Sequence, residues 1–78
     1  MNREAEAAFL WSLGKRVPLL RLVRELTQDE LAGAAGMSRS FLSLIEKGSH
    51  GVDVVRLLRL AEALNVSLPE LLDRCFRG

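Results

Sequence analysis

Residues 27–48 read TQDELAGAAGMSRSFLSLIEKG, and this stretch decides the fold. Thr27 and Glu30 match a capping box, in which the threonine hydroxyl accepts an early amide hydrogen bond and the glutamate reaches back to the threonine amide. The helix that begins there is stopped by Gly36, and Ser38 is a typical N-cap for the next helix. The stretch therefore predicts two short helices joined by a tight turn.

The residue types in this stretch suit two helices that cross closely. Ala32 lies at the expected crossing, where a larger side chain would force the helices apart, and Gly36 supplies the positive φ that the turn needs. Leu42 and Ile45 are spaced to anchor the second helix in the core. The outward positions of that helix are Ser38, Arg39, Ser40, Ser43 and Lys47. A face rich in donors and free of acid is suited to entering a major groove and reading base edges.

The chain before this stretch predicts an N-terminal helical extension. Phe9, Leu13 and Val17 recur at helical spacing. Pro18 would remove a backbone donor and crowd the preceding turn if a single helix continued through it. We expect a helix within residues 1–16 that breaks before Pro18, in preference to one kinked helix.

The C-terminal third predicts two more helices. Asp53 is an N-cap, and the apolar residues that follow it at helical spacing are Val54, Leu57, Leu58, Ala61 and Leu64. Ser67 and Glu70 repeat the capping box and open a fifth helix, which is expected to hold Leu71, Leu72, Cys75 and Phe76. Five helices with short connections predict an all-α fold, a compact orthogonal five-helix bundle formed by residues 1–78 as one domain.

Composition narrows the class of protein. The single cysteine cannot form an internal disulfide, and this favours a reducing compartment. There is no apolar run long enough to span a membrane, and the N-terminus lacks the order of a signal peptide. We expect a cytoplasmic protein without membrane contact. The sequence indicates no cofactor, metal or small-molecule ligand, and no set of nucleophile, acid and base that would make an enzyme.

Net charge leaves the question of a nucleic-acid partner open. Eleven Lys and Arg residues stand against ten Asp and Glu residues, which gives a net charge of +1. A nucleic-acid-binding protein often has a stronger positive excess, so the sum argues mildly against one. Phosphate contact depends on a local face, however, and the polar face described above carries two cations.

A resemblance to a known family covers roughly residues 13–72. The motifs that carry it are LGKRV at 13–17, LR at 20–21, TQDELA at 27–32, GMSRS at 36–40, LIEKG at 44–48 and LAEALNVS at 60–67. With these in register, the chain resembles the lambda-repressor-like (Cro/Xre) helix-turn-helix family. Its small size resembles stand-alone controllers of restriction–modification, phage or plasmid systems. It departs from the family pattern at Pro18, at Glu25, where a glycine is common, and at Gly51-Val52.

The resemblance implies roles for individual residues. Base contacts are expected from Arg39, Ser40 and Ser43, and phosphate contacts from Gln28, Ser38, Lys47, Ser49 and His50. Arg21 and Glu46 are expected to form a structural pair between two helices. The alternative for each polar residue is an ordinary solvated surface, and Trp11 is expected to be a packing anchor.

The expected function is that of a sequence-specific DNA-binding transcriptional regulator, most simply a repressor or autoregulator. One short helix reads only a few base pairs, so useful specificity requires a homodimer on a palindromic operator of double-stranded DNA. The expected dimer contact is formed by Leu68, Leu72, Cys75 and Phe76, with the apolar residues Leu19, Leu22 and Val23 as the other candidate. The alternative function is a protein-interaction module, such as an antitoxin-like or adaptor protein with the same fold.

Overall fold

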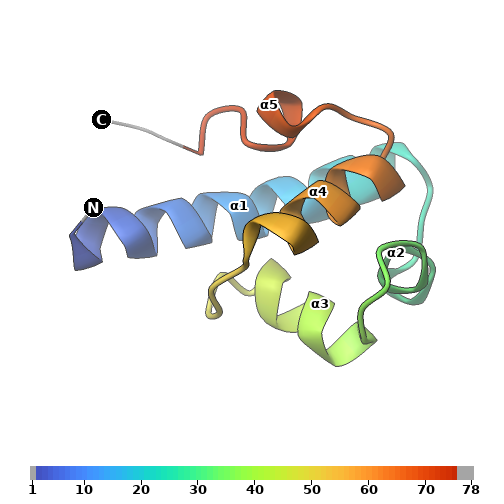
Figure 1. Ribbon diagram of the computed structural model, residues 1–78, viewed down its shortest axis with the longest axis horizontal. Coiled ribbons are helices and arrows are strands. Elements are labelled where there is room, and N and C mark those ends of the chain that lie inside the picture. Colours follow the sequence, from blue (N-terminus) through green and yellow to red (C-terminus); the bar gives the residue numbers. More distant parts are fainter. Residues whose placement is uncertain (1, 76–78) are drawn as a thin grey trace.

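The computed structural model describes residues 2–75, and the helices within them follow the predicted order (Figure 1). Their bounds are α1 (Arg3–Val23), α2 (Gln28–Ala34), α3 (Arg39–Glu46), α4 (Val54–Ala63) and α5 (Leu68–Leu71). The long helix α1 runs the length of the molecule, with α3 packed on one side and α5 on the other, while α4 lies across the front (Figure 1). Among these residues none is in a strand, so the all-α prediction is confirmed.

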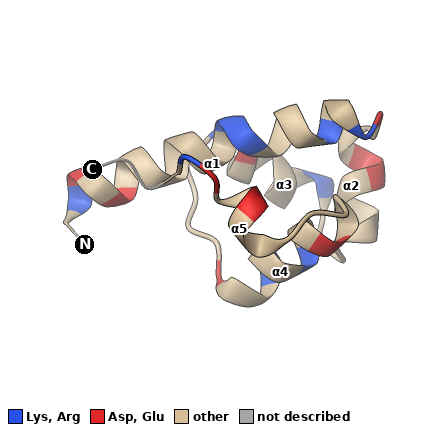
Figure 2. Cartoon of the chain, turned by 90° about the horizontal axis from the view of Figure 1, so that it is seen from above, with Lys and Arg blue, Asp and Glu red and all other residues tan. Residues whose placement is uncertain are grey.

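The two predicted capping boxes begin α2 and α5. Glu30 donates its amide to Thr27 Oγ1 over 3.1 Å, and Thr27 returns an amide to Glu30 Oε1 over 2.8 Å. Ser67 and Glu70 repeat this arrangement with distances of 3.2 and 3.0 Å. The amide hydrogen bonds from Thr27 and Ser67, followed by those of their side chains, lower the pKa of the two glutamates. Figure 2 shows acidic residues at the starts of α1 and α5, where their negative charge interacts favourably with the helix dipole.

Single caps start the other two short helices as the sequence predicts. The hydroxyl of Ser38 accepts the amide of Phe41 over 3.0 Å, and Asp53 Oδ1 accepts the amide of Arg56 over 2.9 Å. The amide of Arg56, followed by its side chain, lowers the pKa of Asp53. Gly36 has φ of +68°, which confirms the left-handed turn between α2 and α3.

α1 does not break before Pro18, and our expectation of a break was wrong. The helix continues unbroken to Val23 with the proline inside it. Leu13 and Val17 before the proline and Leu20 after it all pack on the same core. A proline inside a helix costs about 3 kcal/mol. Burying one large aliphatic side chain gives about 1.5–3 kcal/mol, so burial on both sides outweighs that cost.

The core is built from one apolar side of each helix. Its fully buried large members are Leu13, Val17, Leu31, Leu42, Ile45, Leu60, Leu64 and Leu71. Two predicted core residues of α4, Val54 and Leu58, are exposed, and Leu60 is buried in their stead. Trp11 is 60% exposed and does not anchor the packing as expected.

α1 and α3 approach each other unusually closely at Gly14. A Cβ at this position would lie 2.8 Å from the carbonyl oxygen of Ile45 and 2.9 Å from that of Glu46. Because real side chains do not tolerate such contacts, the glycine permits the last turn of α3 to rest directly on α1. This contact helps fix the orientation of α3.

α5 is shorter than predicted. It ends at Leu71 and is followed by a turn, in which Cys75 is buried in the core. The predicted contribution of Phe76 lies outside the described residues. Among residues 2–75, none of the helices has the length and hydropathy of a membrane-spanning segment.

Candidate nucleic-acid interface

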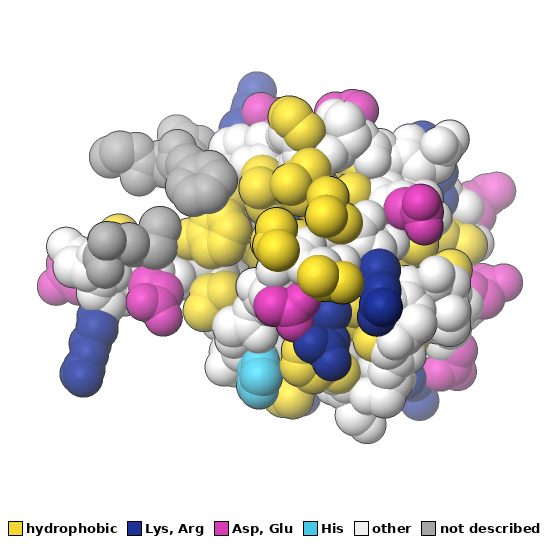
Figure 3. All heavy atoms as spheres, in the orientation of Figure 1, with side chains coloured by type: hydrophobic (Ala, Val, Ile, Leu, Met, Phe, Trp, Pro, Cys, Tyr) yellow, Lys and Arg dark blue, Asp and Glu magenta, His cyan; other side chains and the backbone are white. Residues whose placement is uncertain are grey.

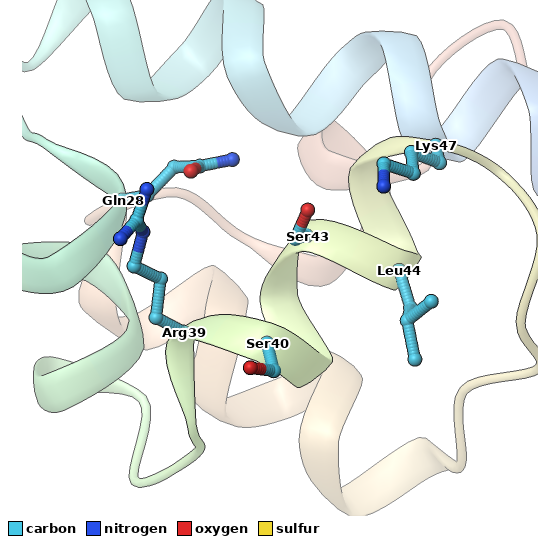
Figure 4. Close-up of a pocket in the computed structure, with 6 residues that line it drawn as sticks. All are labelled: Gln28, Arg39, Ser40, Ser43, Leu44 and Lys47. Atoms are coloured by element: carbon cyan, nitrogen blue, oxygen red, sulfur yellow. The ribbon is translucent and has the colours of Figure 1, made fainter.

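α3 presents one polar side to the surface because its other side is held in the core. Leu42 and Ile45 are buried beneath it. The outward side lines a shallow hollow of about 380 Å³, formed by Gln28, Arg39, Ser40, Ser43, Leu44 and Lys47 (Figure 4). The structure therefore brings the three residues predicted to contact bases together with two of those predicted to contact phosphates.

The residues of the hollow are arranged along α3. Gln28 and Arg39 meet at the start of the helix, Lys47 stands at its other end, and Ser43 lies between them (Figure 4). α3 has eight residues, so it is about 12 Å long at 1.5 Å per residue. An α-helix with its side chains is about 10–12 Å across, and this diameter fits the major groove of B-DNA, which is about 12 Å wide.

A hydrogen-bonded network fixes α3 against α1 and α2. Glu46 accepts two hydrogen bonds from Arg21, from Nε over 3.0 Å and from Nη2 over 3.3 Å. It also accepts one from Gln28 Nε2 over 2.8 Å. The side chains of Arg21 and Glu46 are 16% and 10% exposed, and Arg21 Nη1 donates to the carbonyl of Leu26. The structure thus brings the predicted Arg21–Glu46 pair together and adds Gln28 to it.

Gln28 consequently has a structural duty as well as a place in the hollow. One N–H of its amide group is bound to Glu46, whereas the amide oxygen and the second N–H are not used by that bond. The sequence alone predicted only a phosphate contact here. A partner for Glu46 on α2 is a matter of tertiary geometry that no local pattern indicates.

An acidic side chain that the sequence analysis missed stands beside Arg39. Asp29 Oδ1 lies 3.8 Å from Arg39 Nε, and these side chains are 77% and 65% exposed. The outward face of α3 itself carries no acid, as expected, but Asp29 adds a carboxylate at its edge from another helix. Asp29 belongs to α2, and it reaches the polar face of α3 because the two helices begin close together.

The loop after α3 carries the remaining predicted phosphate contacts. Ser49 Oγ donates to the carbonyl of Leu44 over 3.4 Å, and His50 Nδ1 lies 2.9 Å from the carbonyl oxygen of Gly51. The His50 ring meets Phe41 edge to face, with 5.2 Å between ring centres.

Arg56 of α4, which the sequence analysis did not identify, is a further cation near α3. Arg56 of α4 lies 4.9 Å from the centre of the Phe41 ring and forms an ion pair with Asp53. The same ring contacts His50 of the loop that follows α3. No spacing within the chain pairs Arg56 with α3, because the contact with the aromatic ring of Phe41 is made in the tertiary structure.

Metal binding and cysteine chemistry are both disfavoured among residues 2–75. No group of three or more His, Cys, Asp and Glu residues within residues 2–75 is arranged to hold a metal ion. Burial raises the pKa of the Cys75 thiol, so it stays protonated at neutral pH and is a poor nucleophile.

Comparison with known proteins gives one consistent result. A family described as "Helix-turn-helix" matches residues 20–71. The chain is 36% identical over 62 residues to control protein C.SmaI of Serratia marcescens, covering 80% of this chain and 74% of that protein. It is 35% identical over 57 residues to the immunity repressor protein of Bacillus phage phi105, covering 73% of this chain and 40% of that protein.

A solved structure shares the fold closely. The restriction-modification controller protein C.AhdI from Aeromonas hydrophila superposes with a TM-score of 0.78 at 37% sequence identity. The match covers 80% of this chain and 94% of that structure.

Proposed function

Because this chain belongs to the helix-turn-helix family of DNA-binding transcriptional regulators, which act by binding and not by catalysis, we propose that it represses or autoregulates a promoter by occupying a palindromic operator as a homodimer. The observation that carries the proposal is the hollow on α3. A rigidly held helix offers its polar side there, and donor groups lie along its length. The names of the similar controller and repressor proteins support the same kind of role.

We assign base reading to Arg39, Ser40 and Ser43. A guanidinium in the first turn of α3 can donate twice to O6 and N7 of guanine, a pairing worth about 1–3 kcal/mol against a wrong base. The serine hydroxyls both donate and accept, so either can adapt to the neighbouring base. Leu44, which also lines the hollow, suits contact with a thymine methyl group.

We assign backbone contacts to the residues at the rim: Gln28, Ser38, Lys47, Ser49 and His50. Lys47 is exposed at the C-terminal end of α3, where a groove-bound helix approaches the phosphates. Its attraction is electrostatic and independent of sequence. Arg56 is a further candidate because it lies beside Phe41 near the same loop.

A selection experiment tests this assignment. Duplexes bound from a random pool are expected to converge on a palindrome with half-sites about 34 Å apart. On single-base variants of that palindrome, Arg39→Ala should remove the preference at one symmetric pair of positions. Lys47→Ala should instead weaken all duplexes alike and reduce the salt slope by about 1 per subunit. If Arg39→Ala lowers every affinity evenly, Arg39 only clamps phosphate.

We propose that the dimer forms through the exposed apolar side of α4 together with α5. Val54, Val55 and Leu58 are half or more exposed, and Leu68 and Leu72 are partly buried beside them. Figure 3 shows apolar side chains gathered over α4 and α5 on one face. This face and the hollow are built from different residues, so α3 stays available in a dimer. Cys75, which the sequence analysis placed in the dimer contact, is buried in the core and is not exposed on this face.

A matched pair of variants tests the choice of interface. Leu58→Glu on α4 should convert the dimer to a monomer in sedimentation equilibrium, because it buries a carboxylate in the contact. Leu22→Glu on α1 introduces the same charge at an equally apolar, exposed site and should leave the dimer intact. The reverse result would transfer the interface to α1.

A second candidate function follows from the apolar residues of α1. Leu19, Leu22 and Val23 are exposed as predicted, and such a group on a helix favours contact with another protein. In that case the fold would serve as an adaptor. Binding to random-sequence duplex separates the two functions: a regulator must show salt-dependent affinity for it, whereas a pure adaptor need not.

A further inference from the structure

We propose that Asp29 determines base specificity by holding the Arg39 side chain in the orientation that reads guanine. The inference rests on the proposed function of α3 and adds a residue from α2 to its reading surface. Asp29 and Arg39 line one hollow with Arg21, Thr27 and Gln28, at the point where α2 and α3 both begin. The carboxylate is thus a neighbour of the residue expected to carry most of the specificity.

The position of Asp29 leaves the terminal nitrogens of the Arg39 guanidinium free to donate to a base. Asp29 Oδ1 faces Arg39 Nε at 3.8 Å. An arginine has five N–H donors, and one of them is on Nε. A carboxylate at Nε occupies one edge of the guanidinium and leaves the outer N–H groups of Nη1 and Nη2 as a parallel pair of donors. O6 and N7 of guanine form the matching pair of acceptors.

The energetic effect of Asp29 arises only when DNA is bound. In the free protein both side chains are largely exposed, so the pair adds little to stability. DNA displaces water from the contact, and the Coulomb attraction then strengthens because the local dielectric falls.

Asp29 also opposes non-specific binding. A carboxylate beside the groove-facing end of α3 repels phosphates and competes with them for the guanidinium. Arg39 is therefore discouraged from acting as a phosphate clamp on any sequence. Arg39 gains two hydrogen bonds where a guanine lies opposite it. Asp29 therefore lowers the affinity for DNA of any sequence and raises the discrimination between bases.

The test compares two variants that each remove one exposed carboxylate. Asp29→Asn keeps the size of the side chain and removes its charge. Asp73→Asn is the matched control, since Asp73 follows α5 and is also exposed beside an arginine, Arg74, at 3.9 Å. Fluorescence anisotropy is measured on the selected operator, its single-base variants and random duplex at several salt concentrations, and melting temperature verifies folding.

Asp29→Asn should lower the preference for guanine at the position read by Arg39 by about three- to tenfold, a part of what a bidentate arginine–guanine pair supplies. Affinity for random duplex should rise by about two- to fivefold, since one repelling charge per subunit is removed. Asp73→Asn should leave the base preference unchanged. In the Arg39→Ala background, Asp29→Asn should have no further effect on that position.

Two results separate the failure of this inference from the failure of the proposed function. If the wild-type protein selects no operator, the proposed function fails and the inference falls with it. If the operator is selected and Arg39→Ala abolishes the guanine preference while Asp29→Asn leaves it intact, only the role of Asp29 is refuted. An equal effect of Asp73→Asn would likewise overturn it, because the change would then reflect total charge.

Discussion

Replacing Glu46 by alanine perturbs the network that fixes α3 against α1. Its carboxylate accepts hydrogen bonds of 3.0 and 3.3 Å from Arg21 and one of 2.8 Å from Gln28. Since the Arg21 side chain is only 16% exposed, the substitution strands a cation largely out of water. Nη1 of Arg21 still donates to the carbonyl of Leu26, which retains part of its hydrogen bonding.

The expected cost follows from this partial burial. Removing one partner of a buried ion pair costs about 3–5 kcal/mol. Some water contact and the remaining bond to Leu26 favour the lower end, about 3 kcal/mol. In a domain of this size each kcal/mol shifts the melting temperature by about 4–8 °C, so Glu46→Ala should lower it by about 12–24 °C.

Thermal and urea unfolding at one protein concentration measure this effect. Glu6→Ala is the control, because Glu6 is an exposed acid in the first turn of α1. A double-mutant cycle with Arg21→Ala should show coupling of about 1–3 kcal/mol, since either single substitution already breaks the pair. Equal melting temperatures for Glu46→Ala and Glu6→Ala would refute the reasoning, and so would additive effects in the cycle.

Three further predictions concern stability. Gly14→Ala brings a Cβ within 2.8 Å of a backbone oxygen of α3, so it should lower the free energy of unfolding by about 1–3 kcal/mol and with it the urea midpoint. Gly33→Ala, with open space around the new Cβ, should raise the urea midpoint. Because the pKa of Glu30 and of Glu70 is lowered in the folded state, their contribution is full above the unfolded pKa and is lost as pH falls through the folded one. Urea midpoints should therefore decline below about pH 4 less steeply when both are Gln. Pro18→Ala should raise the melting temperature, since it restores a helical N–H; a decrease would show that the fold requires the proline.

The starts of the short helices could be predicted from sequence because their determinants are local. A capping box such as Thr27 with Glu30 lies within four residues, and both of its hydrogen bonds form inside that segment. Asn65 follows the same logic, since asparagine is among the residues that readily adopt a positive φ directly after a helix, and its φ is 57°. Local chemistry decides these features, and tertiary packing did not alter them.

Features decided by packing could not be predicted in the same way. The cost of Pro18 inside α1 is visible in the sequence, but the burial that offsets it depends on which surfaces meet. α4 shows the same limit, because helical spacing fits Leu58 and Leu60 to a core side equally well. α2 and α5 both pack on α4, and in this arrangement Leu60 is buried and Leu58 exposed.

In the candidate site, too, some residues could be predicted from local sequence and others depend on tertiary packing. Arg39, Ser40 and Ser43 follow from the register of a single helix once its core side is known. Asp29 and Arg56 are brought to that helix from other elements, and no spacing in the chain relates them to it. A surface that reads DNA is thus partly assembled by tertiary structure, even when its principal helix is apparent from the sequence.

The net charge of +1 does not oppose DNA binding, because the local face counts for more than the sum and several of the ten acidic residues are hydrogen-bonded within the fold. Glu30 and Glu70 close capping boxes, and Glu46 is neutralised by an arginine of α1. Arg39 and Lys47 instead stand at the two ends of the exposed hollow. Charges farther apart than about 8 Å are largely screened at physiological salt. In a molecule 33 Å long, the acids at the free end of α1 therefore have little influence on a phosphate at α3, and the local face decides.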